Sequence, residues 1–583
     1  MINRVISVIM SVLISITGTV YSSFNGFIDT LSEMLYGVPY SVEAIKDDFF
    51  DDMDDSDVVK IDDNSGFVKD KIVVFLKPDL SFFEKVSFFD SIEGRLVGWC
   101  TAADMYVLNY YDMTYDAVTA KCDRLASYDC VELASPVTAY RTDLNRTPTD
   151  DFEYPDVYDE WDELNPDGRN WWLEAIDARQ AWDYSDYMSK ISIGVLDSGF
   201  DIDHPDLEGK ISFPNEKQAN RNSEDNHGCH VAGIIGANHN GYGIAGICDN
   251  SELMCVDWYP NGVQYWNTEL AIFFGFSTLV QAGAKVVNMS LGSSASKTGN
   301  SSGWFEKNVT PKIYSYIMCS LLNKGYDFIY VQSAGNGNYY GDPVDAENNG
   351  SFCTINENNI FTGSYDYSSE DILGRIIVVG SATNSYNGKY IQSYFTNLGD
   401  TVSIFAPGED IYSTSISGGY EVMSGTSMSA PIVTAVASLV WSVNEEFTGP
   451  EVKDIICSST DSMASINRSV AYIYGFELKD YPMVNAKLSV EEAIRRSDST
   501  VGTVVGSIIG DAAEIVYDGV SHTIFSDGSY SFVASDGSGI AEIKDKNGKT
   551  LGSFDMTVIA GSTCYAGEYI ITDNSPATAS YAA

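Results

Sequence analysis

The sequence predicts an α/β protein whose main domain, residues 170–498, is built on a parallel sheet with helices on both faces. Strand-length runs rich in β-branched residues, such as ISIGVL at 191–196 and KVVNMS at 285–290, alternate there with longer helical patterns. Near-continuous apolar strands between helices are typical of a parallel sheet buried on both faces. Further strands are predicted at 253–256, 327–333 and 375–382, with helices at 268–283 and 311–325. An α+β unit is expected before this domain and a small β-sandwich after it.

The smaller unit before the main domain covers residues 71–148. Its patterns read, in order, KIVVFLK as a strand, SFFEKVSFFDSI as a helix, GRLVGWC and MYVLNY as strands, YDAVTAKCDRLAS as a helix and CVELASP as a strand. Val118, Cys122 and Leu125 share one face of the second helix. The βαββαβ order predicts a ferredoxin-like fold, which alone carries no function.

The first 23 residues resemble a secretory signal peptide. Arg4 precedes the uncharged run VISVIMSVLISITGTV, and small residues follow at Ser22 and Ser23. An uncleaved membrane anchor is the alternative. Either interpretation predicts export, to a secreted, extracellular or cell-surface location. No later stretch is apolar for long enough to cross a bilayer, so no membrane span beyond the signal is expected.

Acidic residues dominate the charge of the chain. Nine aspartates fall between residues 47 and 63, so 24–70 is predicted to be a solvated segment of low order. Nine more acidic groups lie within 150–168, which predicts an exposed linker at 149–169. The net charge of −48 argues against a nucleic-acid partner, because the phosphate backbone would be repelled.

The C-terminal region, residues 499–583, shows short alternating stretches separated by turn residues and no helical periodicity. Asn547-Gly548 between two such stretches is a hairpin signal, which favours the small β-sandwich. The ten cysteines of the chain are scattered and form no CxxC pair, so a structural zinc site is not predicted. No disulfide pairing is assigned.

Asp197 in VLDSG directly follows a predicted buried strand. The carboxyl ends of strands in open α/β sheets form the crevice where functional sites collect. An ordinary Asp-Ser-Gly turn is one alternative. An aspartic peptidase is another, but it needs a second such motif so that two carboxylates share a proton, and no second copy stands in comparable strand context.

HGCHVAGIIGA predicts a helix that begins at His227, with Asn226 as its cap. His230 lies one turn later on the packed side. The two histidines could hold a metal, but they lack a nearby carboxylate and the Glu of HExxH, so that interpretation ranks low. His204, in DIDHPDL, is expected to shape a loop.

GTSMSAP places Ser427 at the start of a long apolar helix. Pro431 is tolerable in its first turn, where the amide has no intrahelical partner. A serine there is ordinarily an N-cap. The combination with the first two motifs weakens that interpretation, as does the wholly apolar helix that fixes Ser427 in the core of the domain.

VLDSG, HGCHVAG and GTSMSAP resemble, in that order, the three signatures of the subtilisin family of serine peptidases. Their spacings of 30 and 200 residues fit the family if a loop is inserted before the serine. The similarity covers about residues 170–495, beginning with WWLEAIDARQAW. It implies a subtilisin-like fold and a serine endopeptidase with the triad Asp197, His227 and Ser427, acting through an acyl-enzyme.

The resemblance extends to residues that contact substrate. QSAGN implies that the Asn336 side chain donates to the oxyanion, together with the backbone amide of the serine. NMSLG implies that Ser290, Leu291 and Gly292 pair with the substrate backbone as an added strand. One wall of the primary specificity pocket would then consist of Ser333, Ala334 and Gly335. Their small side chains are expected to leave that pocket open.

No cofactor is required for this chemistry, although the resemblance allows a calcium ion with Asp206 as one ligand. The loop NHNGYG, which follows the histidine helix, lacks the usual further ligands. Cys229 stands where the family usually has threonine, and a thiol reagent there is expected to block the cleft. The loops at 293–310 and 338–372 are expected to shape the rim of the cleft.

The unit at 71–148 resembles the propeptide of subtilisins, which assists folding and inhibits the enzyme intramolecularly. The expected partners are therefore protein or peptide substrates and the chain's own propeptide. Autoprocessing is predicted within residues 136–146. The rival interpretation is a surface binding protein that keeps the fold without activity and adheres through its C-terminal β domain.

Overall fold

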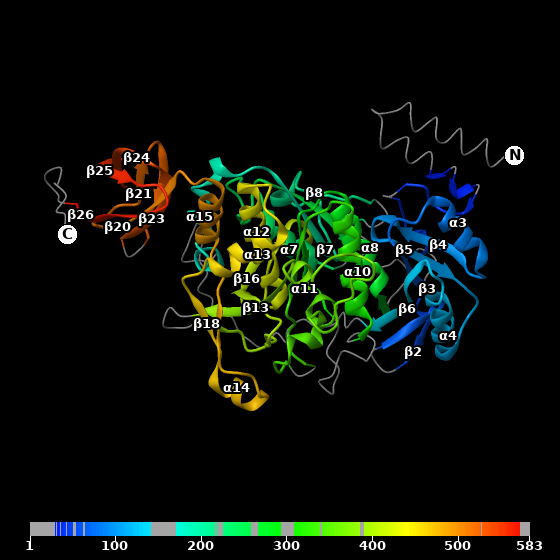
Figure 1. Ribbon diagram of the computed structural model, residues 1–583. Helices are drawn as coiled ribbons and strands as arrows, with labels where there is room; N and C mark the ends of the chain where they lie inside the picture. Colours follow the sequence, from blue (N-terminus) through cyan, green and yellow to red (C-terminus); the bar gives the residue numbers. More distant parts are fainter. Residues whose placement is uncertain are drawn as a thin grey trace, which may run out of the picture.

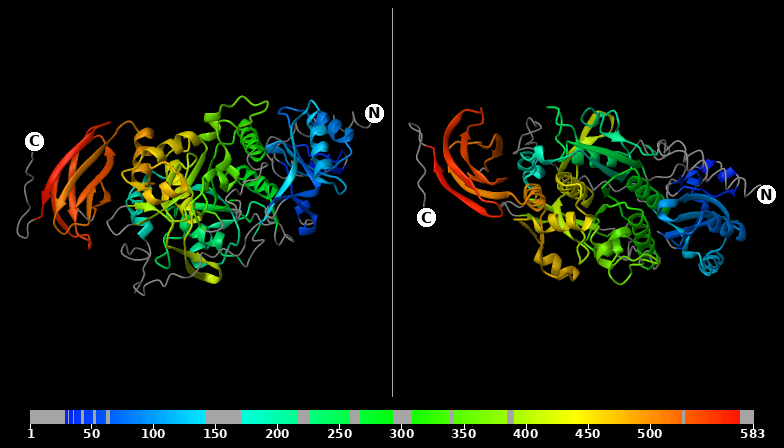
Figure 2. Two further views of the ribbon diagram at one scale, coloured as in Figure 1. Left: turned by 90° about the horizontal axis from the view of Figure 1, so that it is seen from below. Right: turned by 45° about the horizontal axis from the view of Figure 1, so that its top comes forward.

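The computed structural model describes residues 29–571 except for 31, 35, 42–43, 51–53, 62–64, 142–170, 216–218, 220–224, 258–265, 293–307, 339–340, 385–389 and 526–527. Three units follow one another along the chain, with the N-terminal and C-terminal units at opposite ends of the central one (Figures 1 and 2). The predicted signal at 1–23 and the predicted linker at 149–169 lie outside the described residues.

The central unit contains a ten-stranded sheet in the order β19-β18-β14-β13-β12-β11-β7-β9-β8, with β15 beside β13. The strands from β8 to β13, and β15, pair in parallel. Among the described residues, the antiparallel pairs of this sheet lie toward one end of the order, at β13–β14 and β18–β19. The strand bounds are β7 Ile191–Asp197, β8 Ile211–Ser212, β9 Ser251–Asp257, β11 Val286–Met289, β12 Ile329–Ser333, β13 Ile376–Asn384, β14 Tyr390–Gln392, β15 Ile404–Pro407, β18 Met463–Ser465 and β19 Asp480–Pro482.

Helices bury both faces of this sheet, as the apolar strand pattern predicts. Ile193 and Val195 of β7 belong to one core with α7 (His227–Gly236) and α12 (Thr426–Val443). Leu196, on the opposite face, joins a second core with α8 and α10. The remaining helices and the small hairpin strands of this unit are α5 Trp171–Glu174, α6 Ala178–Trp182, η4 Ser185–Tyr187, η5 Pro205–Leu207, α8 Glu269–Gln281, α10 Thr310–Asn323, η7 Ala346–Asn349, η8 Ser351–Thr354, α11 Ser369–Leu373, β16 Ile411–Ser415, η9 Ile416–Gly418, β17 Gly419–Met423, α13 Gly449–Ser458, α14 Arg468–Tyr474 and α15 Ala486–Ser497.

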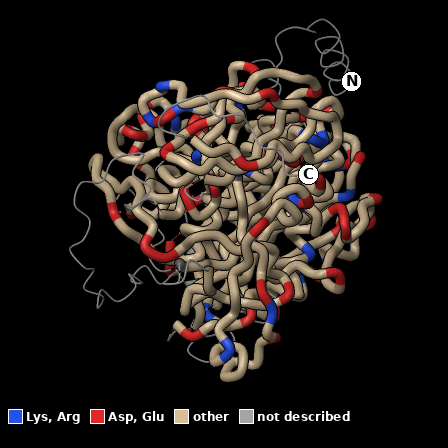
Figure 3. The backbone as a smooth tube through the Cα atoms, turned by 90° about the vertical axis from the view of Figure 1, so that its left-hand side faces the viewer, with Lys and Arg blue, Asp and Glu red and all other residues tan. Residues whose placement is uncertain are grey.

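Among the described residues, α12 is the one helix long and apolar enough to cross a bilayer, and it is buried in the protein core. All ten cysteines are free thiols. Acidic residues outnumber basic ones in the sequence, and they are spread over the described backbone (Figure 3).

The N-terminal unit is a sheet in the order β1-β4-β5-β3-β6-β10, with β2 beside β3. One face of this sheet packs on its own helices α3 and α4, and the other packs on α8 and α10 of the central unit. Its elements are β1 Ile45–Lys46, η1 Asp48–Phe50, η2 Asp55–Asp57, β2 Val58–Lys60, β3 Ser65–Leu76, α3 Phe82–Ser91, β4 Arg95–Cys100, η3 Thr101–Ala103, β5 Met105–Asn109, α4 Tyr115–Ala126 and β6 Val131–Arg141.

The prediction of low order for residues 24–70 is wrong for the described part of that segment. β1, η1, η2, β2 and the start of β3 lie within it. The physical reason is a pair of aromatic side chains between the aspartates. Phe49 and Phe50 are buried, and their rings lie 5.6 and 5.8 Å from the ring of Phe274 on α8. Burial of two aromatic rings offsets the ordering of an otherwise acidic stretch.

β6 joins the N-terminal unit to the central unit. Its last residues pair antiparallel with β10 (Trp266–Thr268), the short strand that leads into α8, in the register Ala139 opposite Thr268. A side-chain network reinforces this junction. The buried carboxylate of Asp104 accepts hydrogen bonds from Ser320 Oγ at 2.7 Å and from Tyr365 Oη at 2.6 Å, and it pairs with Lys324 Nζ at 2.8 Å.

The C-terminal unit has two small sheets, β23-β20-β26 and β22-β21-β24-β25. The Asn547-Gly548 turn connects β24 to β25 as an antiparallel pair. The unit packs against α15, where Tyr184 Oη donates to Glu491 Oε1 at 2.7 Å and accepts from Val533 N at 3.0 Å. The strand bounds are β20 Val501–Ile509, β21 Glu514–Tyr517, β22 Val520–Thr523, β23 Ser529–Ser535, β24 Gly537–Lys544, β25 Thr550–Val558 and β26 Thr563–Ile570.

Candidate active site

Asp197 and His227 meet at the carboxyl end of the central sheet. Asp197 is the last residue of β7 and is 2% exposed, while His227 is the first residue of α7. His227 Nδ1 lies 2.6 Å from Asp197 Oδ1, so the carboxylate holds the ring with Nδ1 protonated. The second ring nitrogen, Nε2, is thereby left as the base, which is the arrangement of the acid and base in a catalytic triad.

Backbone contacts hold this pair in place. Gly228 N donates to Ser198 O at 2.7 Å, which ties the first turn of α7 to the residue after Asp197. Gly199 has a φ of 74°, and a Cβ there would lie 1.9 Å from the carbonyl oxygen of Asp225. Only glycine allows this close approach of the two loops.

Asp225, for which no sequence pattern predicted a role, hydrogen-bonds to the start of this helix. Its Oδ1 accepts from His227 N at 3.1 Å, and its Oδ2 accepts from Ser198 Oγ at 2.6 Å. The Asn226 side chain makes no cap hydrogen bond, because it donates instead to Ser415 and Glu421. Asn226 thus stands at the N-cap position, as predicted, but Asp225 supplies the side-chain hydrogen bond to the first turn.

The two histidines of α7 have opposite electrostatic environments. Burial alone would lower the pKa of His227, but the carboxylate of Asp197, its hydrogen bond and the charge of Asp225 together raise it. Burial and the neighbouring His227 lower the pKa of His230 to about 3, so this ring is neutral. His230 Nε2 faces the carbonyls of Ile411 and Glu421 at 3.0 and 3.1 Å, so it serves packing, not metal binding.

Ser427 is the second residue of α12, the helix that packs against α7. Its Oγ donates to Ser290 O at 3.4 Å, and Ser290 Oγ donates to Ser427 O at 2.7 Å. Among the described residues, no hydrogen bond joins Ser427 Oγ to the His227 ring. Catalytic hydrogen bonds are often long without substrate and tighten in the complex.

Asn336 lies beside this serine with its amide group free to donate. Asn336 Oδ1 accepts from both Thr426 N and Thr426 Oγ1 at 2.8 Å, which orients the carboxamide. Its Nδ2 lies 3.1 Å from the Cβ position of Gly425 and has no acceptor among the described residues. A fixed donor next to a nucleophile is what stabilisation of an oxyanion requires.

The two predicted substrate-binding segments follow neighbouring parallel strands, β11 and β12. Ser290 and Leu291 are nearly buried, and Gly292 is half-buried. On the other side, Ser333 ends β12, with Ala334 and Gly335 after it. A third segment reaches this region, because a Cβ built on either Gly292 or Gly335 would clash with the side chain of Asn349. The small side chains of the wall residues therefore do not by themselves determine the width of the pocket.

The buried carboxylate of Asp206 does not fit a calcium site. Its oxygens accept from Asn240 Nδ2 at 3.2 Å, Ile244 N at 2.9 Å and Tyr420 Oη at 2.8 Å. These donors occupy the positions that a cation needs, and the described residues contain no cluster of three acidic, histidine or cysteine side chains suited to a metal.

His204 shapes a loop, as predicted. Its Nδ1 accepts from Asp206 N at 3.1 Å, and its Nε2 lies 2.8 Å from Gly419 O. Cys229 is fully buried, and burial raises the pKa of its thiol to about 11, so the expected block by a thiol reagent has no accessible thiolate to act on.

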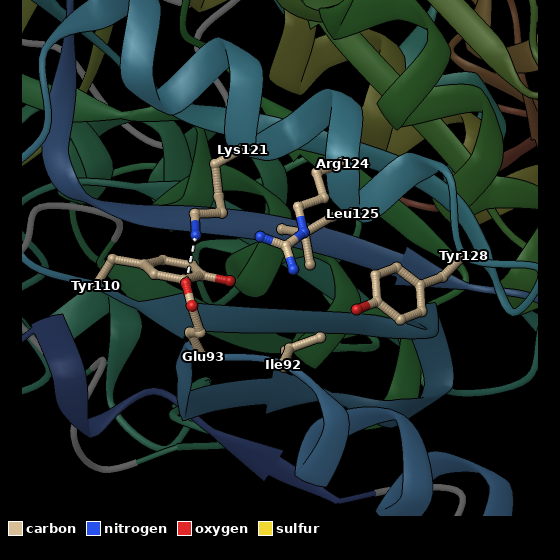
Figure 4. A pocket seen from close by; sticks show the side chains of 7 residues that line it. All are labelled: Ile92, Glu93, Tyr110, Lys121, Arg124, Leu125 and Tyr128. Atoms are coloured by element: carbon tan, nitrogen blue, oxygen red, sulfur yellow. Dashed lines mark hydrogen bonds and ion pairs between the residues drawn. The ribbon is translucent and has the colours of Figure 1, made fainter.

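A separate hollow lies on the N-terminal unit, away from these residues (Figure 4). Lys121 Nζ there lies 5.1 Å from the ring centre of Tyr110 and 2.9 Å from Glu93 Oε2. The hollow contains no nucleophile beside a base, so it contributes nothing to the site at the central sheet.

A buried carboxylate, an imidazole, a serine at a helix start and an orientated amide lie at one edge of the parallel sheet, and these are the groups that serine hydrolysis requires. Residues 188–476 match the model of the subtilase family. The central unit of the chain is therefore a domain of the subtilase family.

Individual relatives agree with this assignment. The chain is 28% identical to the minor extracellular protease Epr of Bacillus subtilis, over 57% of this chain and 44% of that protein. It is 30% identical to a thermophilic serine proteinase of a Bacillus species, over 50% and 62%. Subtilisin DY of Bacillus licheniformis is 27% identical over 47% and 85%. The matching region thus spans less than two thirds of the first two relatives.

The fold is also that of a solved structure. Fervidolysin from Fervidobacterium pennivorans, a keratinolytic enzyme related to subtilisin, superposes with a TM-score of 0.50 at 18% identity. The superposition covers 88% of this chain and 79% of fervidolysin.

Proposed function

We propose that this chain is a secreted endopeptidase that hydrolyses peptide bonds in proteins and is made as a zymogen that processes itself. The observation that carries the proposal is the 2.6 Å contact between His227 Nδ1 and Asp197 Oδ1, at the edge of the sheet where Ser427 opens its helix. The extracellular location named for the Bacillus subtilis relative supports export of this chain too.

In the proposed mechanism, Ser427 Oγ first leaves its weak hydrogen bond to Ser290 O and donates to His227 Nε2. His227 takes the proton as Oγ attacks the substrate carbonyl, and Asp197 stabilises the imidazolium that forms. His227 then gives the proton to the leaving amine. Water, activated by the same ring, hydrolyses the acyl-enzyme and restores the serine.

Asn336 stabilises the tetrahedral intermediates of both steps. Its Nδ2 would donate to the oxyanion together with the backbone amide of Ser427. Because Thr426 already holds Oδ1, the donor needs no reorganisation during the reaction. Loss of one such donor typically costs about 2.7–4 kcal/mol of transition-state stabilisation.

The N-terminal unit is proposed to be the intramolecular inhibitor. Its strand β6 runs extended into the central unit and pairs there with β10, in the way that an extended peptide adds a strand to a sheet. Cleavage within the predicted window 136–146 would fall in the second half of β6, which ends at Arg141, or just after it. Residues 142–146 of that window lie outside the described residues.

A fluorophosphonate probe tests the activity directly, because it reacts only with an activated serine. Labelling of the processed protein that disappears in Ser427→Ala supports the proposal. Absence of labelling in protein whose N-terminus shows correct processing would favour the inactive surface binding protein instead. N-terminal sequencing of the secreted protein tests the processing window independently.

A further inference from the structure

The two glycines that face each other across the substrate pocket both touch the same side chain. A Cβ built on Gly292 would lie 2.2 Å from Asn349 Oδ1, and one built on Gly335 would lie 2.6 Å from the same oxygen. Gly292 follows β11 and Gly335 follows β12, so the carboxamide of Asn349 lies between the two walls.

Asn349 is held there by the pocket wall itself. It is 8% exposed and ends η7, and its Nδ2 donates to Ser333 O at 2.8 Å. Cys353 Sγ lies 3.5 Å from the same carbonyl oxygen and packs behind it. The carboxamide is therefore a built part of the pocket and not the end of a mobile surface side chain.

The oxygen of this carboxamide remains an unused acceptor. No described residue donates a hydrogen bond to Asn349 Oδ1. This oxygen lies 2.6 Å from the Gly335 Cβ position, beside Asn397 Nδ2 at 2.5 Å. An acceptor at the closed end of a shallow pocket favours a short side chain, and best a hydroxyl that can donate to it.

We propose that Asn349 closes the primary specificity pocket and restricts the substrate residue whose carbonyl is attacked, the P1 residue, to small side chains such as alanine and serine. The inference rests on the proposed peptidase function and names its substrate class. An aromatic or long aliphatic P1 side chain needs the volume between Gly292 and Gly335 that the carboxamide fills. Binding such a residue would require Asn349 to leave Ser333 O and become unpaired.

The test compares peptide p-nitroanilides that differ only in P1, assayed with the full-length processed protein. The expected kcat/KM is at least tenfold higher for P1 alanine and serine than for P1 phenylalanine and leucine, since one methylene too many typically costs a factor of about 10 to 200. Asn349→Gly should raise kcat/KM for P1 phenylalanine at least tenfold. The ratio of kcat/KM for P1 phenylalanine to kcat/KM for P1 alanine should rise by a similar factor.

Two further variants make the result specific. Asn358→Ala, an exposed asparagine on the same loop, should leave the P1 profile unchanged. Asn349→Ser removes less volume than the glycine variant and should give an intermediate gain, which covers the case in which Asn349→Gly does not fold.

The outcomes separate this inference from the proposed function. An unsubstituted enzyme that cleaves P1 phenylalanine as fast as P1 alanine overturns the inference and leaves the peptidase proposal intact. A protein that cleaves none of the peptides and takes no fluorophosphonate label overturns both. A small-P1 preference that persists in Asn349→Gly also overturns the role of Asn349, because the limit must then come from another residue.

Discussion

The N-terminal and C-terminal units contact the central unit in different ways. The N-terminal sheet has a core of its own against α3 and α4, which includes Trp99 and Leu108, besides the face that packs on α8 and α10. The C-terminal unit has no separate core among its described residues. Its buried residues, such as Val504 and Phe532, belong to the same core as α12 and α15.

The connections differ in the same sense. Between β6 and α5 there are 29 residues, 142–170, whereas α15 ends at Ser497 and β20 begins at Val501. A unit with its own core and a long connection can separate from its partner without unfolding, but a unit that shares a core cannot. The N-terminal unit is therefore a separately folded domain that docks on the central unit. The C-terminal unit is an extension of the central unit, because the two share one core.

The largest test of this comparison is Ser427→Ala. Activity should fall by about 10⁶-fold, as expected for loss of the nucleophile. Because the N-terminal unit can then no longer be cut off, the secreted chain should keep it. Peptide hydrolysis and the mass of the purified chain measure the two effects. A variant that loses activity and still appears processed would mean that another peptidase makes the cut.

The second test acts on the C-terminal junction. Glu491 is 1% exposed, accepts from Tyr184 and pairs with Lys487 Nζ at 2.8 Å. Glu491→Ala leaves a buried ammonium unpaired, so the free energy of unfolding should fall by roughly 3–5 kcal/mol, measured in urea.

Glu492→Ala is the matched control for this loss. Its surface pairs with Arg495 and Arg496 should be worth about 1 kcal/mol or less. An equal loss of stability in the two variants would mean that the buried pair does not hold the C-terminal unit.

The third test acts on the N-terminal junction. Asp104→Ala removes the acceptor of three contacts and leaves Lys324 unpaired, which should weaken docking by about 2–5 kcal/mol. Activity should then appear sooner after processing, followed as the lag before peptide hydrolysis. Asp112→Ala, at an exposed ion pair in the same unit, should keep the original lag. A lag unchanged by Asp104→Ala would place the control of release elsewhere.

The smallest expected effect is a shift in the pH dependence of kcat/KM. It should respond to changes at the active site and not to changes at the two junctions. His227 must be neutral to act as base, and its raised pKa moves the rise of kcat/KM with pH above the usual histidine value of about 6.5. Asp225→Asn removes one of the two charges responsible, so the midpoint should move down by less than about one pH unit. Glu491→Ala and Asp104→Ala should not move it, since neither residue faces the ring. A midpoint insensitive to Asp225→Asn would rule out its electrostatic role.

Residues whose pattern is local were predicted well from the sequence. The apolar runs that became β7 and β11 lie where their composition indicated, because strand propensity and burial on both faces act along a few neighbouring residues. The Asp197–His227 contact could be expected for the same reason. Each side chain stands at the end of an element whose position the sheet determines.

Features that depend on distant segments could not be predicted. The pairing of β6 with β10 joins residues more than a hundred positions apart, and nothing in either stretch indicates its partner. Asn349 lies in a loop expected only to shape the rim of the cleft, and its place between two glycines follows from how η7 returns to the sheet. Phe49 and Phe50 lie between aspartates, and the charge of those aspartates favoured the prediction of low order for the whole segment.

The spacing of acid and base depends on a residue without a side chain. At Gly199 the bare backbone of one loop lies directly against the carbonyl of the other. Even a methyl group there would clash with the carbonyl of Asp225 and push the loop that follows Asp197 away from the start of the helix that carries His227. The contact between Asp197 and His227, on which proton transfer depends, thus requires that residue 199 has no Cβ. Gly199→Ala should therefore lower kcat more than the addition of one methyl group usually does.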